Sequence, residues 1–167
     1  QARFAMPEKI QGNLVRLRLW KNSLVGNLGK TVICLDRKTG DMQWFFEAQR
    51  AELSLAVGGN HVYVAELLNA RRGETLAKSN TKTFALDITS GRQVWQGVGG
   101  TDLRYSEPHD LLLTGTAIYK GKDGSVHRKK NTANPSQNKW NSKSGGLIAG
   151  DSLRVGGSDN FVMYDLT

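Results

Sequence analysis

The stretch that decides the fold is CLDRKTGDMQW at residues 34–44, which recurs as ALDITSGRQVW at residues 85–95. In both copies an Asp ends an apolar run, a Gly stands four positions after the Asp, and a Trp stands four positions after the Gly. These landmarks are Asp36, Gly40 and Trp44 in the first copy and Asp87, Gly91 and Trp95 in the second. Three matched landmarks at equal spacing indicate an internal repeat.

Two weaker copies follow the first two. The third keeps Gly124, but Lys120 stands where the Asp is expected and Arg128 where the Trp is expected. The fourth reaches Asp165, and the sequence ends two residues later, before the position of its Gly. A short apolar segment precedes each copy, so each unit contains more than one strand.

The residue types of one unit predict a hairpin with a packing anchor. A strand runs to the Asp, a turn with Gly at positive φ reverses the chain, and a returning strand carries the Trp. The Asp can accept hydrogen bonds from backbone N–H groups of its own turn, and the Trp offers a large apolar surface to a neighbouring sheet. A period of about 40 residues with such hairpins is typical of β-propeller blades. We therefore predict an all-β fold, a partial β-propeller with about four blades of four antiparallel strands, in which Trp44 and Trp95 are buried.

The pattern Ala-Leu-Asp-x-x-x-Gly-x-x-x-Trp resembles the PQQ-like (quinoprotein-type) propeller repeat, from about residue 20 to residue 167. The resemblance is specific for the repeat and not for an activity. It implies a bacterial family that includes quinone-dependent dehydrogenases and non-catalytic scaffolds of the kind found in the outer-membrane protein assembly machinery. A periplasmic or cell-envelope location is favoured by this resemblance alone.

Propellers of this type have about seven or eight blades. We therefore expect residues 1–167 to form a single segment that is a fragment of a larger propeller. An isolated half-propeller would leave sheet faces and edges open. The remaining blades of the same propeller, a protein partner, or a second copy in a homodimer (if the chain is complete) would have to cover them.

Charge and composition exclude some classes and leave the partner open. The chain has 23 Lys and Arg against 15 Asp and Glu, a formal net charge of +8. This charge attracts nucleic acid, anionic lipid or an acidic protein, and it is also compatible with a solvated basic surface. No apolar run approaches the ~18 residues of a membrane span. Cys34 is the only cysteine, which excludes an internal disulfide, and we expect it to be a small buried hydrophobic residue.

The favoured function is that of a non-catalytic scaffold or interaction domain, which binds a protein or another macromolecule through the loops between blade strands. One polar insertion, at residues 67–75, contains an arginine pair that can clasp a carboxylate or a phosphate. Another, at residues 129–140, is polar and basic. Both insertions are also compatible with a solvated surface. The residues expected to make contacts are Arg71, Arg72, Lys129, Lys130 and Trp140.

A first alternative is a fragment of a PQQ-dependent dehydrogenase. By resemblance, such enzymes hold the quinone over a Trp, often near a disulfide between adjacent cysteines, with Ca²⁺ bound by Glu, Asn and Asp. One cysteine cannot form that disulfide, and no motif places a calcium cluster or a catalytic Asp in this chain. We therefore assign no cofactor and no catalytic, cofactor-binding or metal residue, and interpret Asp36 and Asp87 as structural.

A second alternative is a basic nucleic-acid-binding surface. The third unit is rich in Lys and Arg, and Trp140 could stack on a base. However, no nucleic-acid-binding motif is present, and strand alternation sends neighbouring side chains in different directions. The loop SEPHD at residues 106–110 also gathers polar side chains, which turn chemistry explains without a catalytic role.

Overall fold

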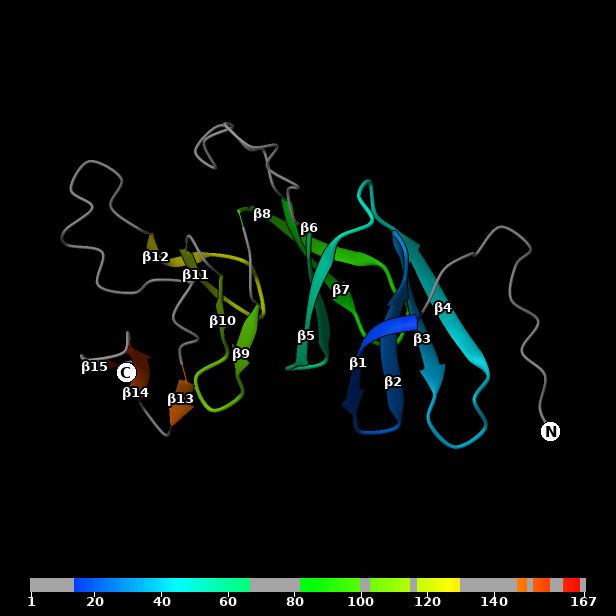
Figure 1. Ribbon diagram of the computed structural model, residues 1–167, viewed down its shortest axis with the longest axis horizontal. Coiled ribbons are helices and arrows are strands. Elements are labelled where there is room, and N and C mark those ends of the chain that lie inside the picture. The colour runs from blue at the N-terminus through cyan, green and yellow to red at the C-terminus, as the bar shows by residue number, and fades with distance from the viewer. Residues whose placement is uncertain are drawn as a thin grey trace.

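The computed structural model describes residues 14–66, 82–99, 103–114, 117–129, 147–149, 152–156 and 161–165. The regular elements of these residues are all β-strands, and they form four antiparallel sheets that follow one another along the molecule (Figure 1). We call these sheets blades 1 to 4 in chain order. The part of the chain that the structure describes contains no helix long and apolar enough to cross a membrane.

Blade 1 is a four-stranded meander in which each strand pairs with the next. Its register places Val25 opposite Cys34 and Cys34 opposite Trp44, so these three side chains share one face. The strands are β1 (Leu14–Trp20), β2 (Ser23–Leu28), β3 (Thr31–Asp36) and β4 (Met42–Glu47).

Blade 2 repeats this topology, and both of its faces are covered. Val62 and Val64 face blade 1, whereas Tyr63 and Ala65 face blade 3, and all four are fully buried. The strand that contains them therefore reads as a continuous apolar run rather than an alternating one. The strands are β5 (Leu53–Gly58), β6 (His61–Glu66), β7 (Lys82–Asp87) and β8 (Gln93–Val98).

Blade 3 has shorter strands in the same order, and three strands of blade 4 are described. The strands of blade 3 are β9 (Arg104–Ser106), β10 (Leu111–Leu113), β11 (Ala117–Lys120) and β12 (Val126–Lys129). The strands of blade 4 are β13 (Leu147–Ala149), β14 (Ser152–Gly156) and β15 (Phe161–Asp165). The predicted all-β fold of four-stranded antiparallel blades is confirmed for blades 1 to 3.

The hydrophobic core lies between blades rather than within one sheet. One cluster joins blades 1 and 2 and contains Cys34 and Trp44 together with Leu55 and Val64. A second cluster joins blades 2 and 3 and is rich in aromatic residues. We call these two contacts seam 1–2 and seam 2–3. Cys34 is fully buried, as expected, and burial raises the pKa of its thiol, which suits a packing role rather than a reactive one.

Candidate functional site

The two repeat tryptophans bind the blade that follows their own. The indole N–H of Trp44 in blade 1 donates to the carbonyl oxygen of Ile88 in blade 2 at 2.7 Å. The indole N–H of Trp95 in blade 2 donates to the carbonyl oxygen of Gly121 in blade 3, also at 2.7 Å. Ile88 and Gly121 both come one position after the third strand ends. Equivalent hydrogen bonds therefore join blade 1 to blade 2 and blade 2 to blade 3.

The repeat glycines let each indole approach the turn of the next blade. A Cβ added to Gly91 would lie 2.6 Å from Cδ2 of Trp44, and one added to Gly124 would lie 2.5 Å from Cδ2 of Trp95. Both glycines also have positive φ, +69° and +70°. Glycine is thus required twice at each position, by the backbone conformation and by the ring that lies on it.

The repeat aspartates hold their own turns. One carboxylate oxygen of Asp36 accepts the backbone N–H groups of Lys38 and Thr39 at 2.8 and 2.9 Å. Asp87 accepts the hydroxyl and the backbone N–H of Ser90 at 2.7 and 2.8 Å. These donors lower the pKa of both carboxyls. Both side chains therefore cap the turns in which they stand.

The third turn keeps the backbone geometry although Lys120 replaces the Asp. The N–H of Gly124 donates to the carbonyl of Lys120 at 3.0 Å, which matches the bonds at the two earlier turns. Asp123 accepts the N–H of Ser125 at 2.8 Å, and the hydroxyls of Thr39 and Ser90 accept the corresponding N–H groups in the two earlier turns. The degenerate copy is thus a genuine structural repeat.

Seam 2–3 contains a polar cluster that the sequence did not reveal. The hydroxyl of Tyr105 donates to one carboxylate oxygen of Asp110 at 2.8 Å, and the N–H of Lys122 donates to the other at 3.1 Å. The ring of Tyr63 stacks on that of Tyr105, with centroids 5.1 Å apart. Burial raises the pKa of both phenols. A Cβ on Gly58 would overlap the Tyr105 ring, and this close approach explains one glycine of the pair at residues 58–59.

The loop at residues 106–110 therefore contributes Asp110 to a structural network. Its acidic neighbour Glu107 accepts the N–H of Gly59 at 3.3 Å, which adds a second link across the seam. Among the described residues, no group of three or more His, Cys, Asp or Glu side chains is placed to hold a metal ion. The signal that could have revealed the cluster was the Gly-Gly pair of one unit combined with the Tyr of the next.

The two edges of the blades differ in character. The turns between third and fourth strands, at residues 37–41, 88–92 and 121–125, lie along one edge, which we call the turn edge. The antiparallel order then places the end of β6, the start of β7 and the end of β12 at the opposite edge (upper edge in Figure 1), which we call the loop edge. Both basic insertions are attached at the loop edge.

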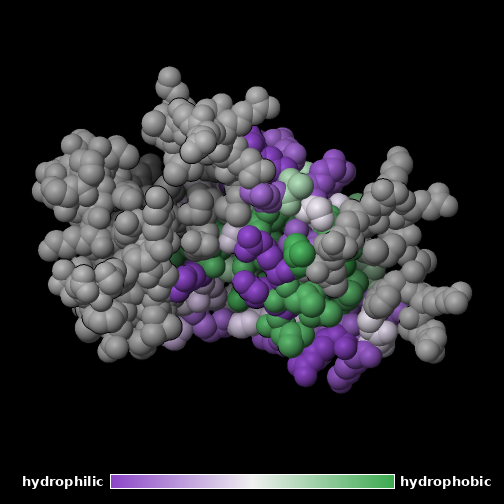
Figure 2. Space-filling model, viewed as in Figure 1, coloured by the Kyte–Doolittle hydropathy of each residue, from purple (hydrophilic) through white to green (hydrophobic). Residues whose placement is uncertain are grey.

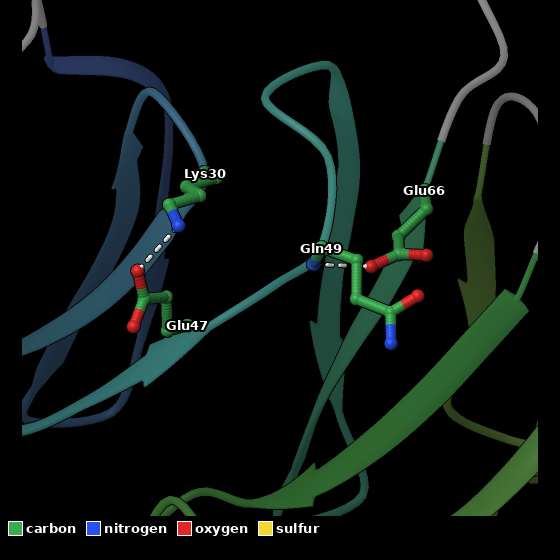
Figure 3. A network of polar contacts seen from close by, with 4 residues as sticks. All are labelled: Lys30, Glu47, Gln49 and Glu66. Atoms are coloured by element: carbon green, nitrogen blue, oxygen red, sulfur yellow. Dashed lines mark hydrogen bonds and ion pairs between the residues drawn. The ribbon is translucent and has the colours of Figure 1, made fainter.

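A buried carboxylate anchors the loop edge where the arginine-bearing segment begins. Glu66, the last residue of β6, is 1% exposed, and its Oε1 accepts the backbone N–H of Gln49 at 2.7 Å (Figure 3). Gln49 belongs to the connection between blades 1 and 2. Nearby, Lys30 and Glu47 form an exposed ion pair at 2.6 Å. The sequence analysis missed Glu66, although a carboxylate that ends an apolar strand was the available signal.

The predicted contact residues lie mostly outside the described residues. Arg71, Arg72, Lys130 and Trp140 are in this group. Lys129 is the last residue of β12, and its backbone lies at the loop edge. Asp165 ends β15 and pairs in register with Ser152.

No protein-family model matches the chain, and neither does any curated protein. Similar solved structures include BamB from Moraxella catarrhalis, at 18% identity and a TM-score of 0.61 over 87% of this chain and 43% of that one. The computationally designed protein Ika8 matches at 15% identity and a TM-score of 0.62, over 92% of this chain and 46% of that one. A europium-containing methanol dehydrogenase matches at 13% identity and a TM-score of 0.59, over 84% of this chain and 37% of that one.

The chain thus spans less than half of the length of each of these structures. At these identities the likeness concerns the fold alone. Together with the four sheets and the two repeated seams, it shows that the chain folds as part of a β-propeller.

Proposed function

We propose that this propeller segment is a non-catalytic scaffold, and that the two basic insertions at its loop edge bind an acidic surface of a partner protein. The observation that carries the proposal is that the two edges differ: the repeat residues stabilise the fold at the turn edge, and the basic insertions are attached at the loop edge. On the turn edge, the carboxylates of Asp36 and Asp87 cap their own turns. The indoles of Trp44 and Trp95 donate hydrogen bonds to the next blade. The insertions are attached to the opposite edge.

The charge of the insertions supports an acidic partner. Residues 67–81 contain Arg71, Arg72 and Lys78 against the single acid Glu74, and residues 130–146 contain three lysines and no acid. Both are attached to strands that end on the same edge, so one partner surface can reach both. Attraction between opposite charges speeds such encounters and favours the correct partner. The anchor at Glu66 fixes the point from which the arginine-bearing insertion leaves the blade.

The test uses the full chain with a photo-cross-linking amino acid at Ala70, in the insertion, or at Thr39, on the turn edge, as a matched control. Each protein is irradiated with a bacterial cell-envelope extract, and cross-linked proteins are identified by mass spectrometry. We expect a protein captured from position 70 and not from position 39. The double change Arg71→Glu, Arg72→Glu should abolish capture, whereas Arg37→Glu, Lys38→Glu on the turn edge should leave it intact.

Capture that is equal at both positions, or that survives the change at residues 71 and 72, overturns the proposal. Two direct titrations separate the alternatives. Saturable binding of PQQ with Ca²⁺ would favour the dehydrogenase interpretation. Retention on single-stranded DNA that falls steeply with salt and is lost in the Arg71→Glu, Arg72→Glu variant would favour nucleic acid as the partner.

A further inference from the structure

Seam 2–3 contains a continuous series of aromatic rings. The indole of Trp95, on β8, has its ring centroid 5.7 Å from that of Tyr119 and 6.0 Å from that of Tyr63. The ring of Tyr63, on β6, stacks on that of Tyr105, on β9, with centroids 5.1 Å apart. Indole and phenol rings lose one electron more readily than most side chains, and rings in contact exchange electrons over a short distance. The series therefore offers an electron path from the fourth strand of blade 2 to the first strand of blade 3.

The rings differ in the group that accepts their ionisable proton. The indole N–H of Trp95 donates to the carbonyl oxygen of Gly121, and the hydroxyl of Tyr119 donates to that of Val98, both at 2.7 Å. An amide carbonyl oxygen accepts a hydrogen bond but is a very weak base, so neither proton can be transferred to it. Trp95 therefore keeps its N–H proton after losing an electron, and the resulting radical cation is a strong oxidant.

Tyr63 lies between Trp95 and Tyr105 and has no base at its hydroxyl. Its side chain is fully buried, and no carboxylate or carbonyl oxygen accepts its proton among the described residues. The ring of His61 lies 5.9 Å away between centroids, but its Nδ1 is buried and accepts no hydrogen bond. Burial also raises the pKa of the Tyr63 phenol. Tyr63 can thus pass an electron on, but it cannot hold a lasting neutral radical.

Tyr105 is the one ring of this series that donates to a carboxylate. Its hydroxyl donates to Oδ1 of Asp110 at 2.8 Å, and the N–H of Lys122 holds Oδ2 of the same carboxylate at 3.1 Å. A carboxylate is a far stronger base than a carbonyl oxygen and can accept a proton from a donor within hydrogen-bond distance. When Tyr105 loses an electron, its phenol proton can therefore cross one hydrogen bond to Asp110.

We propose that these rings form an aromatic relay, in which Tyr105 returns an electron to oxidised Trp95 through Tyr63. A one-electron oxidant first removes an electron from Trp95. As Tyr105 supplies the replacement, its proton moves to Asp110. The products are an intact indole, a neutral phenoxyl radical and a protonated carboxyl, so the positive charge of the radical cation is cancelled. A one-electron reductant in solution, a thiolate or ascorbate, then reduces the phenoxyl while Asp110 returns the proton.

The position of the relay suits a protective role for the joint between blades 2 and 3. Trp95, whose indole makes that joint, is 8% exposed, whereas Tyr105 and Asp110 are partly exposed. Asp110 lies in the turn between β9 and β10, which the antiparallel order places at the turn edge. Figure 2 shows hydrophilic residues along the lower border of the described surface, on the side of this edge. A dissolved reductant therefore meets Tyr105 more readily than Trp95.

Trp44 provides a matched control within the same chain. Its indole donates to a carbonyl oxygen at the same distance of 2.7 Å, and it is 7% exposed. Among the described residues, however, no ring contact joins Trp44 to a tyrosine, and the aromatic pair of seam 1–2 consists of Phe46 and Phe84. A phenyl ring is much harder to oxidise than an indole. An oxidised Trp44 therefore has no relay.

Laser flash photolysis of the full chain tests the path. A short ultraviolet pulse ejects electrons from the indoles, a dissolved scavenger removes these electrons, and transient absorption follows the indole and phenoxyl radicals. We expect a phenoxyl rise that matches an indole decay and whose rate does not depend on protein concentration. Trp44→Phe should retain this phase and Trp95→Phe should lose it, while the remaining tryptophans contribute equally to both variants. Equal phases in the two variants overturn the proposal.

Two further variants locate the radical and the base. Tyr105→Phe should abolish the phase. Asp110→Asn keeps an oxygen that can accept the hydrogen bond but cannot take the proton, so it should also abolish the phase while circular dichroism shows the fold retained. Asp123→Asn, at another turn of blade 3, should leave the phase intact. In the original chain the phase should be slower in D₂O. A full phenoxyl rise in Tyr105→Phe or in Asp110→Asn contradicts the proposal.

A second measurement needs no tryptophan variant. The original chain is exposed to carbonate radical anions, a one-electron oxidant, in the presence of ascorbate, and oxygenated tryptophans are quantified by peptide mapping. We expect Trp44 to accumulate oxidation products while Trp95 is spared. In Tyr105→Phe the two indoles should be oxidised to similar extents. Equal oxidation of Trp44 and Trp95 in the original chain, or continued sparing of Trp95 in Tyr105→Phe, overturns the proposal.

Discussion

Trp44 and Ile88 are 44 residues apart in the chain, yet the indole N–H of Trp44 donates to the carbonyl oxygen of Ile88 at 2.7 Å. The same relationship, between Trp95 and Gly121, joins the next pair of blades. Each bond is buried. Each lies beside a position where the positive φ and the close approach of the indole ring require glycine. The Asp, Gly and Trp of the repeat thus act across two blades at once.

Truncating an indole should destabilise the protein strongly. Trp44→Ala removes a side chain that is 7% exposed and leaves a cavity in seam 1–2, so we expect a loss of about 3–5 kcal/mol in the free energy of unfolding. Trp44→Phe should cost less, with about 1–3 kcal/mol arising from the buried carbonyl left without its donor. Urea denaturation measures both. Val94→Ala, at a side chain that is 49% exposed, serves as the control and should change stability by less than about 0.5 kcal/mol. Equal effects at residues 44 and 94 would contradict the account.

Asp87 should contribute to a loss of stability in acid. The hydroxyl and backbone donors of Ser90 and Thr89 lower the pKa of Asp87 below its ordinary value of 3.8. The unfolded chain therefore binds more protons than the folded chain as the pH falls below that value. The stabilisation is fully present above pH 3.8 and is lost as the pH falls towards the folded pKa. Asp87→Asn should flatten this part of the curve of Tm against pH, and Ser90→Ala should give an intermediate slope. An unchanged slope in Asp87→Asn would rule out this contribution.

Tyr105 should contribute to a loss of stability in alkali. Burial and the adjacent Asp110 raise its pKa above the ordinary value of 10.0. The folded chain therefore keeps the phenol protonated while the unfolded chain loses the proton, and stability falls as the pH rises above 10.0. Phenolate absorbance should show that Tyr105 ionises together with unfolding. Tyr105→Phe should make the alkaline loss shallower. It should also cost about 1–3 kcal/mol at neutral pH, because the carboxylate of Asp110 loses a donor. Free ionisation of Tyr105 in the folded chain would argue against the buried cluster.

The sequence predicted the blade architecture because the landmarks that define it are local. Gly40, Gly91 and Gly124 each stand at the same offset in a hairpin, and the hairpin sets its own turn. The sequence could not show that Trp95 of one unit would lie on Gly124 of the next, since that contact depends on the distance between sheets. It also missed the pair Tyr105 and Asp110, because the residues that pack on Tyr105, Tyr63 and Gly58, come from the preceding blade.

The candidate interaction residues are a different case. Composition and the interruption of the second unit point to Arg71 and Arg72, and the strand ends on either side of their segment, Glu66 and Lys82, lie at the loop edge. Its place at the end of an apolar strand was the only sequence signal for Glu66, because its acceptor role depends on the path of the chain at Gln49. Which macromolecule binds there depends on the chemistry of the partner, which a repeat pattern does not encode.

The central claim, that the repeat residues exist to join one blade to the next, is tested most directly by a double-mutant cycle on Trp44 and Gly91. The free energy of unfolding is measured for the original chain, Gly91→Ala, Trp44→Ala and the double variant. When Trp44 is present, Gly91→Ala costs stability for two reasons: the new methyl group overlaps the indole, and Ala is strained at the positive φ. With Ala at position 44 only the strain remains, so the cost of Gly91→Ala should fall by about 0.5–3 kcal/mol. Costs that add to within about 0.5 kcal/mol would contradict the claim, because they would show that the indole and the glycine do not meet.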